Sequence, residues 1–381
     1  MKKRCSKMTQ KLTGMVKMIT DFDMQSKDID KIQESQKMMD RIKRKVNELY
    51  EFLPYRLVKE VQCSGNAISS VSAGGNEIFV EGYFGFRVLD VNNLDRPTEL
   101  IDSSDLLDLS ANYELVGNKV ALFDRPFCKI FSLRHSEDET IFADLGEIYY
   151  NASIVEIGQG DYIVSDDNRL WYIDTAACKK FRQGQEANRR FPISALKIKP
   201  FESMVEEIID MKSLGNSLYL VQESNVLILN DPKNYPADDP NARYSNTVVN
   251  SMHSDFIDIW ADDLGLDKLA KVCPVNEQYM IVIGVDGRVV RWDLGNSKTE
   301  EIMTLRSNKF AIIRLSDQSV ALSDGTFVYV VEDITDPKWT HIHNRKAEGH
   351  FVESLAALPN GRFVVGGASG NLQVFGKKGV A

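Results

Sequence analysis

The chain has 381 residues, of which 43% are hydrophobic and 27% charged, and its formal net charge is −9. This length suits one large domain, or one domain with an appendage, and no segment approaches the ~18 uninterrupted apolar residues of a membrane span. The acidic balance argues against broad nucleic-acid binding, because neutralising phosphates requires clustered Lys and Arg.

The five cysteines lie far apart and form no C-x-x-C pair. This pattern is typical of reduced thiols and offers no zinc-finger ligand set. The basic start, Met1-Lys2-Lys3-Arg4, is followed by polar residues in place of an apolar core, so it does not resemble a secretory signal. We therefore expect a cytoplasmic protein, with the nucleus as the alternative location.

Residues 1–54 differ from the rest of the chain in charge and in texture. They carry 13 Lys and Arg against 8 Asp and Glu, a net charge of +5, so the remainder carries −14. Apolar residues recur in steps of three and four, most regularly at Met39, Ile42, Val46 and Leu49. This stripe predicts an amphipathic helix able to enter a coiled coil. We expect a helical arm that self-associates, pairs with a foreign helix, or packs against the domain that follows.

From residue 55 onward, short alternating segments separated by Gly, Asn and Asp indicate an all-β domain. A unit of strand, tight turn and strand recurs seven times, and its second strands begin near residues 86, 128, 169, 226, 288, 327 and 371. Most steps are roughly 40 residues, and this period predicts a propeller of four-stranded blades. We therefore expect residues 55–381 to form a seven-bladed ring.

Two of the units carry motifs of a known family. The last unit follows Gly349-His350 with VESLAALPNGRFVVGGASGNLQVF, and the fifth unit ends in Arg291-Trp292-Asp293. A Gly-His pair, a Ser-x-x-Gly-type turn and a closing Trp-Asp pair belong to the pattern of WD40 repeats, so the chain resembles a WD40-like propeller with degenerate repeats. A coiled coil followed by such a propeller is similar to several adaptor proteins. The resemblance implies a surface that binds a protein or a peptide.

Counting strands predicts how the ring closes. Four strands per blade leave the seventh blade one strand short, whereas residues 55–61 precede the first blade as an additional strand. If this strand pairs with residues 371–375, no open edge is left at the seam, where an unpaired edge would invite aggregation. We therefore divide the chain into a helical arm of residues 1–54 and a propeller of residues 55–381.

Polar residues between apolar neighbours predict which side chains face the central channel. Such positions on the expected inner strands are Asp108, Glu156, Asp210 and Arg314. Converging carboxylates and a guanidinium could hold a metal ion or serve a hydrolase, but residues in a water-filled channel commonly pair with each other or with backbone groups. We therefore expect no enzymatic activity, no metal and no cofactor, and keep a propeller hydrolase as an alternative.

Candidate partner contacts lie where the repeat is irregular or a turn is exposed, since aromatic and Arg side chains there are common interface anchors. Residues 231–246 predict a long loop, and residues 252–270 place aromatic side chains among five aspartates outside the repeat. The candidates are Tyr83, Phe84, Arg125, Asn168 and Arg288 on turns, and Phe256 and Trp260 in the acidic segment.

The sequence thus favours a non-enzymatic scaffold or adaptor. Its propeller would bind a protein or peptide partner, and its helical arm would form a homo-oligomer or dock into a larger complex. A nucleic-acid-associated propeller that uses the basic arm is a further alternative, which the acidic body disfavours.

Overall fold

The computed structural model describes a β-propeller within residues 55–377. The chain divides into two units, Met1–Arg56 and Leu57–Ala381. Residues 1–54, with the predicted helical stripe, lie outside the described residues, so the arm stays a prediction. The structure describes residues 55–63, 67–82, 85–93, 100–101, 112–124, 127–132, 140–145, 152–158, 160–167, 169–176, 193–194, 196–198, 206–232, 256–306, 309–337, 339–342 and 352–377.

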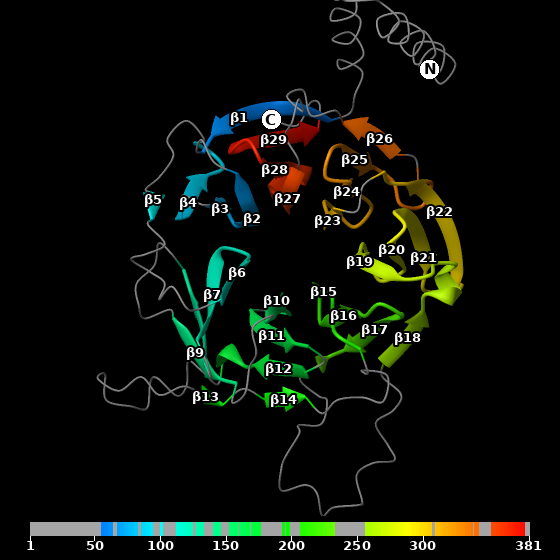
Figure 1. The fold of residues 1–381 in the computed structure, drawn as a ribbon, viewed down its shortest axis with the longest axis horizontal. Coiled ribbons are helices and arrows are strands. Elements are labelled where there is room, and N and C mark those ends of the chain that lie inside the picture. Colours follow the sequence, from blue (N-terminus) through cyan, green and yellow to red (C-terminus); the bar gives the residue numbers. More distant parts are fainter. Residues whose placement is uncertain are drawn as a thin grey trace, which may run out of the picture. The chain divides into compact units, whose positions relative to one another are not determined.

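The strands of the described residues form seven sheets, which are the seven blades. Within each blade the four strands pair antiparallel to their neighbours from the inside of the ring outward, and Figure 1 shows the blades arranged around a common axis. The inner strands are β2 (Ile68–Gly74), β6 (Asn112–Val116), β10 (Ser153–Ile157), β15 (Asp210–Leu214), β19 (Leu269–Pro274), β23 (Ala311–Arg314) and β27 (Val352–Ala357). The second strands are β3 (Glu77–Gly82), β7 (Lys119–Asp124), β11 (Asp161–Asp166), β16 (Ser217–Val221), β20 (Tyr279–Gly284), β24 (Val320–Ser323) and β28 (Phe363–Gly367).

The outer half of each blade consists of a third and a fourth strand. The third strands are β4 (Gly85–Asp90), β8 (Phe127–Phe131), β12 (Arg169–Ile173), β17 (Asn225–Asn230), β21 (Arg288–Asp293), β25 (Val328–Val331) and β29 (Asn371–Lys377). The fourth strands are β5 (Leu100–Ile101), β9 (Ile141–Asp144), β14 (Leu196–Ile198), β18 (Phe256–Trp260), β22 (Lys298–Thr304), β26 (Trp339–Ile342) and β1 (Tyr55–Gln62). The second blade has a fifth strand, β13 (Ile193–Ser194), which runs parallel to β9.

The seam of the ring lies in the seventh blade, where β1 is the neighbour of β29. The backbone N–H of Cys63, just after β1, donates to the carbonyl oxygen of Gly370 at 3.0 Å. The seventh and first blades approach closely at Gly366, because a Cβ atom there would lie 2.5 Å from a side-chain methyl of Val71. The first strand of the propeller in sequence therefore completes the last blade.

The second strands show why this sequence forms stacked sheets. In β20, which reads YMIVIG, and in β24, which reads VALS, every residue except Tyr279 is buried. A strand covered by neighbouring blades on both faces needs apolar side chains on both, and β-branched residues suit such packed sheets. Buried clusters accordingly fill the spaces between successive blades, for example between blades 4 and 5.

The structure confirms the seven-bladed all-β propeller and corrects one element of it. The third strands begin within one residue of the positions that the repeat predicted. The prediction that residues 252–270 stand outside the repeat is wrong for residues 256–260, because β18 pairs along its length with β17 as the fourth strand of blade 4. An alternating sequence such as Phe-Ile-Asp-Ile-Trp fits a half-buried outer strand. The prediction failed because the interruption before this segment obscured the period of the repeat.

Candidate functional site

The inner strands of neighbouring blades are bridged by polar side chains. At three junctions a side chain of one inner strand accepts a hydrogen bond from a backbone N–H of the next inner strand. Each donor residue lies opposite a valine of the second strand in its own blade. The pairs, donor first, are Ile154 and Glu114 at 2.7 Å, Val272 and Asp210 at 3.2 Å, and Val71 and Ser354 at 3.0 Å.

Asp210, predicted to face the channel, is the centre of a charged group between blades 4 and 5. Its carboxylate is buried and lies 3.2 Å from the Lys271 ammonium and 3.3 Å from the Lys212 ammonium. The Asp210 charge raises the pKa of Lys212. Beside them, burial raises the pKa of the Cys273 thiol to about 12, so this cysteine stays neutral. The carboxylate is thus matched by two cations and a backbone donor.

Glu114 occupies the inner strand of blade 2, where the sequence analysis had placed Asp108. The strand begins at Asn112, and Asp108 lies outside the described residues. Burial raises the pKa of the Glu114 carboxyl to about 7, although the hydrogen bond from Ile154 and the nearby Lys212 charge act in the opposite direction. Glu114 therefore changes protonation near neutral pH.

A repeated turn could have located Glu114 from the sequence. The hairpins after β6 and β15 both contain Gly-Asn, with Gly117 and Gly215 in the left-handed region at φ 57° and 58°. Such positive φ values favour glycine, so the two turns align the two blades. The alignment gives Glu114 the strand position that Lys212 has in blade 4, and it puts Asp108 ahead of the strand.

The other predicted channel residues do not join Asp210. Glu156 is exposed on β10, and the Arg314 guanidinium donates to the backbone oxygen of Ser316 at 3.2 Å, within its own hairpin. In the part of the chain that the structure describes, no hydrogen bond or ion pair connects these two side chains with Asp210, and no three potential ligands gather as a metal site would require.

A second group of candidate residues lies on one face of blades 4 and 5. We call this surface the 4–5 face and define it as residues 206–209, 222–225, 260–268 and 284–288. These segments lead into β15, join β16 to β17, connect β18 to β19, and join β20 to β21, so they lie at the same end of the two blades. Backbone hydrogen bonds tie them together, from Ala261 to Ser224 at 2.8 Å and from Val285 to Lys268 at 3.0 Å.

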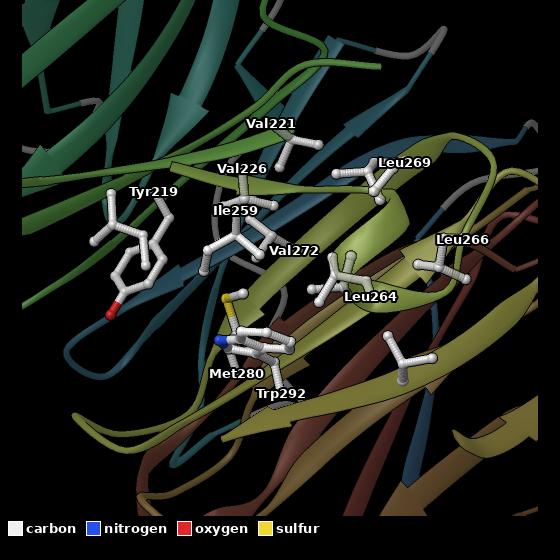
Figure 2. Packing of buried hydrophobic residues seen from close by; sticks show 14 residues of the cluster. Tyr219, Val221, Val226, Ile259, Leu264, Leu266, Leu269, Val272, Met280 and Trp292 are labelled. Atoms are coloured by element: carbon white, nitrogen blue, oxygen red, sulfur yellow. The ribbon is translucent and has the colours of Figure 1, made fainter. Parts of the chain in front are cut away.

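The 4–5 face exposes large apolar side chains on a fixed support. Trp260 is 51% exposed, Val285 52% and Ile209 37%. Trp260 ends β18 in register with Asn225, and its backbone N–H donates to the Asp263 carboxylate at 3.1 Å. Immediately after it, the short 3₁₀ helix η4 (Asp262–Leu264) leads to Leu266, and Figure 2 shows Leu264 and Leu266 in the buried cluster between blades 4 and 5. The backbone that carries Trp260 is therefore held by residues packed in the core.

The charge of the 4–5 face is strongly negative. Its four segments contain seven carboxylates, all on exposed residues, and two cations, a formal net charge of −5. Both cations are already paired inside the face, Lys268 with Glu223 at 2.5 Å and Arg288 with Asp286 at 2.6 Å. The seven acidic residues are Glu206, Glu207, Glu223, Asp262, Asp263, Asp267 and Asp286.

Two of the predicted partner contacts meet on this face. Trp260 is exposed, whereas Arg288 also donates to the carbonyl oxygen of Gly265 at 2.5 Å and so joins two of the segments. The backbone of Phe256 starts β18. Four other candidates lie outside the described residues, namely Tyr83, Phe84, Arg125 and Asn168.

Sequence reasoning missed two other exposed apolar residues of the 4–5 face. Val285 directly precedes Asp286 and Gly287 in a turn, and this exposed valine beside a turn signal was the available indication. Ile209 directly precedes Asp210. In the sequence it was interpreted only as an apolar neighbour of a channel residue, although its side chain is exposed.

Comparisons with known proteins show the fold. No protein-family model matches the chain, and no curated protein matches it either. Among solved structures, one described as YCF48 bound to D1 peptide is similar with a TM-score of 0.56 and 12% identity, covering 87% of this chain and 98% of that one. The WD40 β-propeller domain of Doa1 is similar with a TM-score of 0.50 and 12% identity, covering 86% of this chain and 98% of that one.

Among the described residues, no helix is long and apolar enough to cross a membrane.

Proposed function

We propose that the chain is a non-enzymatic interaction scaffold whose propeller binds a protein or a peptide on the 4–5 face. The observation that carries this proposal is Trp260. Half of its side chain is exposed, while the backbone around it is held by β17 and by the buried leucines of the following connection. Tryptophan is enriched among the residues that dominate binding energies, and a site on a rigid support loses little entropy when a partner binds.

The solved structures support the proposal at the level of the fold. YCF48, which the propeller resembles, is described as bound to a peptide. The channel gives less support to the alternative of a hydrolase, because the Asp210 carboxylate is engaged by Lys212, Lys271 and a backbone N–H. A general base needs an accessible carboxylate within reach of the substrate proton.

Selection from a display library of random peptides on the immobilised full chain tests the proposed face. We expect selected peptides to bind the wild type and to bind Trp260→Ala at least about tenfold more weakly, the size of a moderate hot spot. Ile257→Ala is the matched control, since Ile257 is 45% exposed on the same strand but alternates to its opposite side. Peptides that bind both variants like the wild type would place the binding site elsewhere.

We further propose that the arm assembles the chain through the stripe at Met39, Ile42, Val46 and Leu49. The heptad spacing of these residues supports this. Light scattering on the full chain measures its mass, and Val46→Lys is expected to lower it, whereas Asn47→Lys, beside the stripe, is not. Equal masses for the two variants would exclude self-association through the stripe.

A cytoplasmic location is also proposed, with Cys63, Cys128 and Cys273 as its support. All three thiols are free and buried, a state that fits a reducing compartment. Imaging of the tagged full chain tests the location, and accumulation in a secretory compartment would contradict it.

A further inference from the structure

We infer that the 4–5 face recognises a basic segment of a partner protein, in which lysine or arginine stands next to an apolar residue. This inference rests on the proposed function and adds the chemical class of the partner.

The charge of the face determines the sign of the charge that a binding partner must carry. Net charge on the four segments is −5, and both cations already pair with carboxylates of the same face. Within the face, the amide oxygens of Gln222 and Asn225 are buried and have no hydrogen-bond donor among the described residues. A basic segment is attracted to such a surface, and an acidic one is repelled.

The neighbouring sector of the same side of the ring carries the opposite charge. The connection from blade 5 to blade 6 presents Arg306 and Lys309, both exposed. The negative charge of the 4–5 face therefore does not continue into this neighbouring connection. At physiological salt the Debye length is ~8 Å, so a bound segment senses this local charge.

The exposed apolar residues of the face explain why the partner segment needs an apolar residue as well as basic ones. Trp260 and Val285 each expose about half of the side chain, and Lys268 and Glu223 form an ion pair within the same face. An apolar side chain of the partner buries this surface, and an arginine or lysine can stack on the indole ring as well as meet the carboxylates. Charge alone would not require an exposed tryptophan.

The 4–5 face of a second copy fits this face poorly. A two-fold symmetric contact places the same patch on both sides of the interface, so the 4–5 face would oppose its own negative charge. A segment rich in lysine or arginine avoids this repulsion.

Three matched fluorescent peptides test the inference by anisotropy with the full-length chain. The first carries lysine and arginine around a central pair of leucines, the second replaces the basic residues with glutamate, and the third replaces the leucines with serine. We expect the first to bind, the other two to bind at least about tenfold more weakly, and added salt to weaken the first. Equal binding of the first and third peptides would show nonspecific attraction of a polycation and would overturn the inference.

Variants locate the binding of the first peptide. Asp262→Asn combined with Asp267→Asn removes two exposed charges of the face and is expected to weaken binding about threefold to tenfold. Glu277→Gln combined with Asp317→Asn is the matched control, since these exposed residues lie in the hairpins at the opposite end of blades 5 and 6. Similar effects of the two pairs would overturn the inference.

The failure of the inference can be told apart from the failure of the proposed function. Library peptides that depend on Trp260 but are acidic or uncharged would overturn the basic class and leave the binding face standing. Library peptides that are insensitive to Trp260→Ala would overturn both. Loss of oligomeric mass in Trp260→Ala would show that a second copy covers the face and would also overturn the inference.

Discussion

The inner strands and the 4–5 face use polar residues in different ways. On the inner strands, Glu114, Asp210 and Ser354 each accept a hydrogen bond from the adjacent blade. On the 4–5 face, backbone hydrogen bonds and polar side chains connect the segments to one another, and Trp260 and Val285 are left exposed. The inner side chains therefore contribute to the stability of the ring, whereas the exposed side chains of the face are available to a partner.

This difference separates stability from binding. A residue that bridges two blades is expected to lower the free energy of unfolding when it is removed, with binding changed only through the fold. An exposed residue of the 4–5 face is expected to affect binding and to leave the stability close to that of the wild type. Paired substitutions, one in each region, can break or sharpen this distinction.

Among the residues that bridge two blades, the largest effect is expected for Asp210→Ala. This change leaves the Val272 N–H without its acceptor and two ammonium groups without their partner, and we expect a loss of about 3 kcal/mol in the free energy of unfolding. Urea unfolding measures it. Asp267→Ala, an exposed aspartate of the 4–5 face, is the control and should change stability by less than about 0.5 kcal/mol. Equal losses would erase the distinction between the two regions.

The next effect depends on pH and concerns Glu114. Because its pKa is raised from 4.5 to about 7 in the folded chain, the folded state binds the proton more tightly than the unfolded state. The protonated carboxyl therefore contributes fully to the stability of the fold below about pH 4.5, and this contribution is lost as the pH rises through about 7. Glu114→Gln removes this titration, so the variant should gain stability relative to the wild type, by on the order of 2 kcal/mol, between about pH 5 and about pH 8.

Urea unfolding at several pH values checks the Glu114 prediction. Glu207→Gln, which removes an exposed carboxylate of the 4–5 face, is the matched control. A difference in stability between Glu114→Gln and the wild type that does not change with pH would mean that the pKa of Glu114 is not raised.

A smaller loss is expected for Ser354→Ala, which removes the acceptor of the Val71 N–H at the junction of the seventh and first blades. One neutral hydrogen bond of this kind contributes about 1 kcal/mol. Ser224→Ala, in a turn of the 4–5 face, provides the comparison and should be close to neutral. Thermal unfolding of the two variants distinguishes them, and a Ser354 variant as stable as the Ser224 variant would argue against the bridge.

The smallest change in stability is expected for Trp260→Ala, within about 0.5 kcal/mol of the wild type. The buried Trp292 of the neighbouring blade is the counterpart, and Trp292→Ala should cost about 3–5 kcal/mol because it leaves a cavity in the core. If Trp260→Ala unfolds at the same denaturant concentration as Trp292→Ala, then Trp260 serves the fold and is not free for a partner.

The architecture of the propeller could be predicted because it depends on a repeated local signal. Each third strand follows a tight turn with an apolar run, and these signals recur at a nearly constant period, as in Asp286-Gly287 before β21. The outer strands lack such a signal. Trp260 was identified as a candidate contact, but its strand was placed outside the repeat because the preceding interruption obscured the period.

The channel and the face were predicted less completely because they depend on neighbours in other blades. Asp210 was identified from its apolar neighbours, whereas its partner Lys212, two residues along the same strand, was not. The Gly-Asn turn could have placed Glu114 on its strand, but its raised pKa follows from burial between blades, which no local pattern reveals. A backbone hydrogen bond joins Val285 to Lys268 in the connection between blades 4 and 5, and sequence distance does not predict that link.

Accessibility of Trp260 to acrylamide, followed by fluorescence quenching, tests the proposed binding face most directly. The Trp260→Phe variant provides the background of the other tryptophans, so the difference between the two proteins reports on residue 260. We predict that a peptide selected on the full chain, added at saturation, will strongly reduce this quenching and shift the emission of Trp260 to shorter wavelength. A selected peptide that binds tightly while Trp260 remains as accessible as in the free protein would contradict the account.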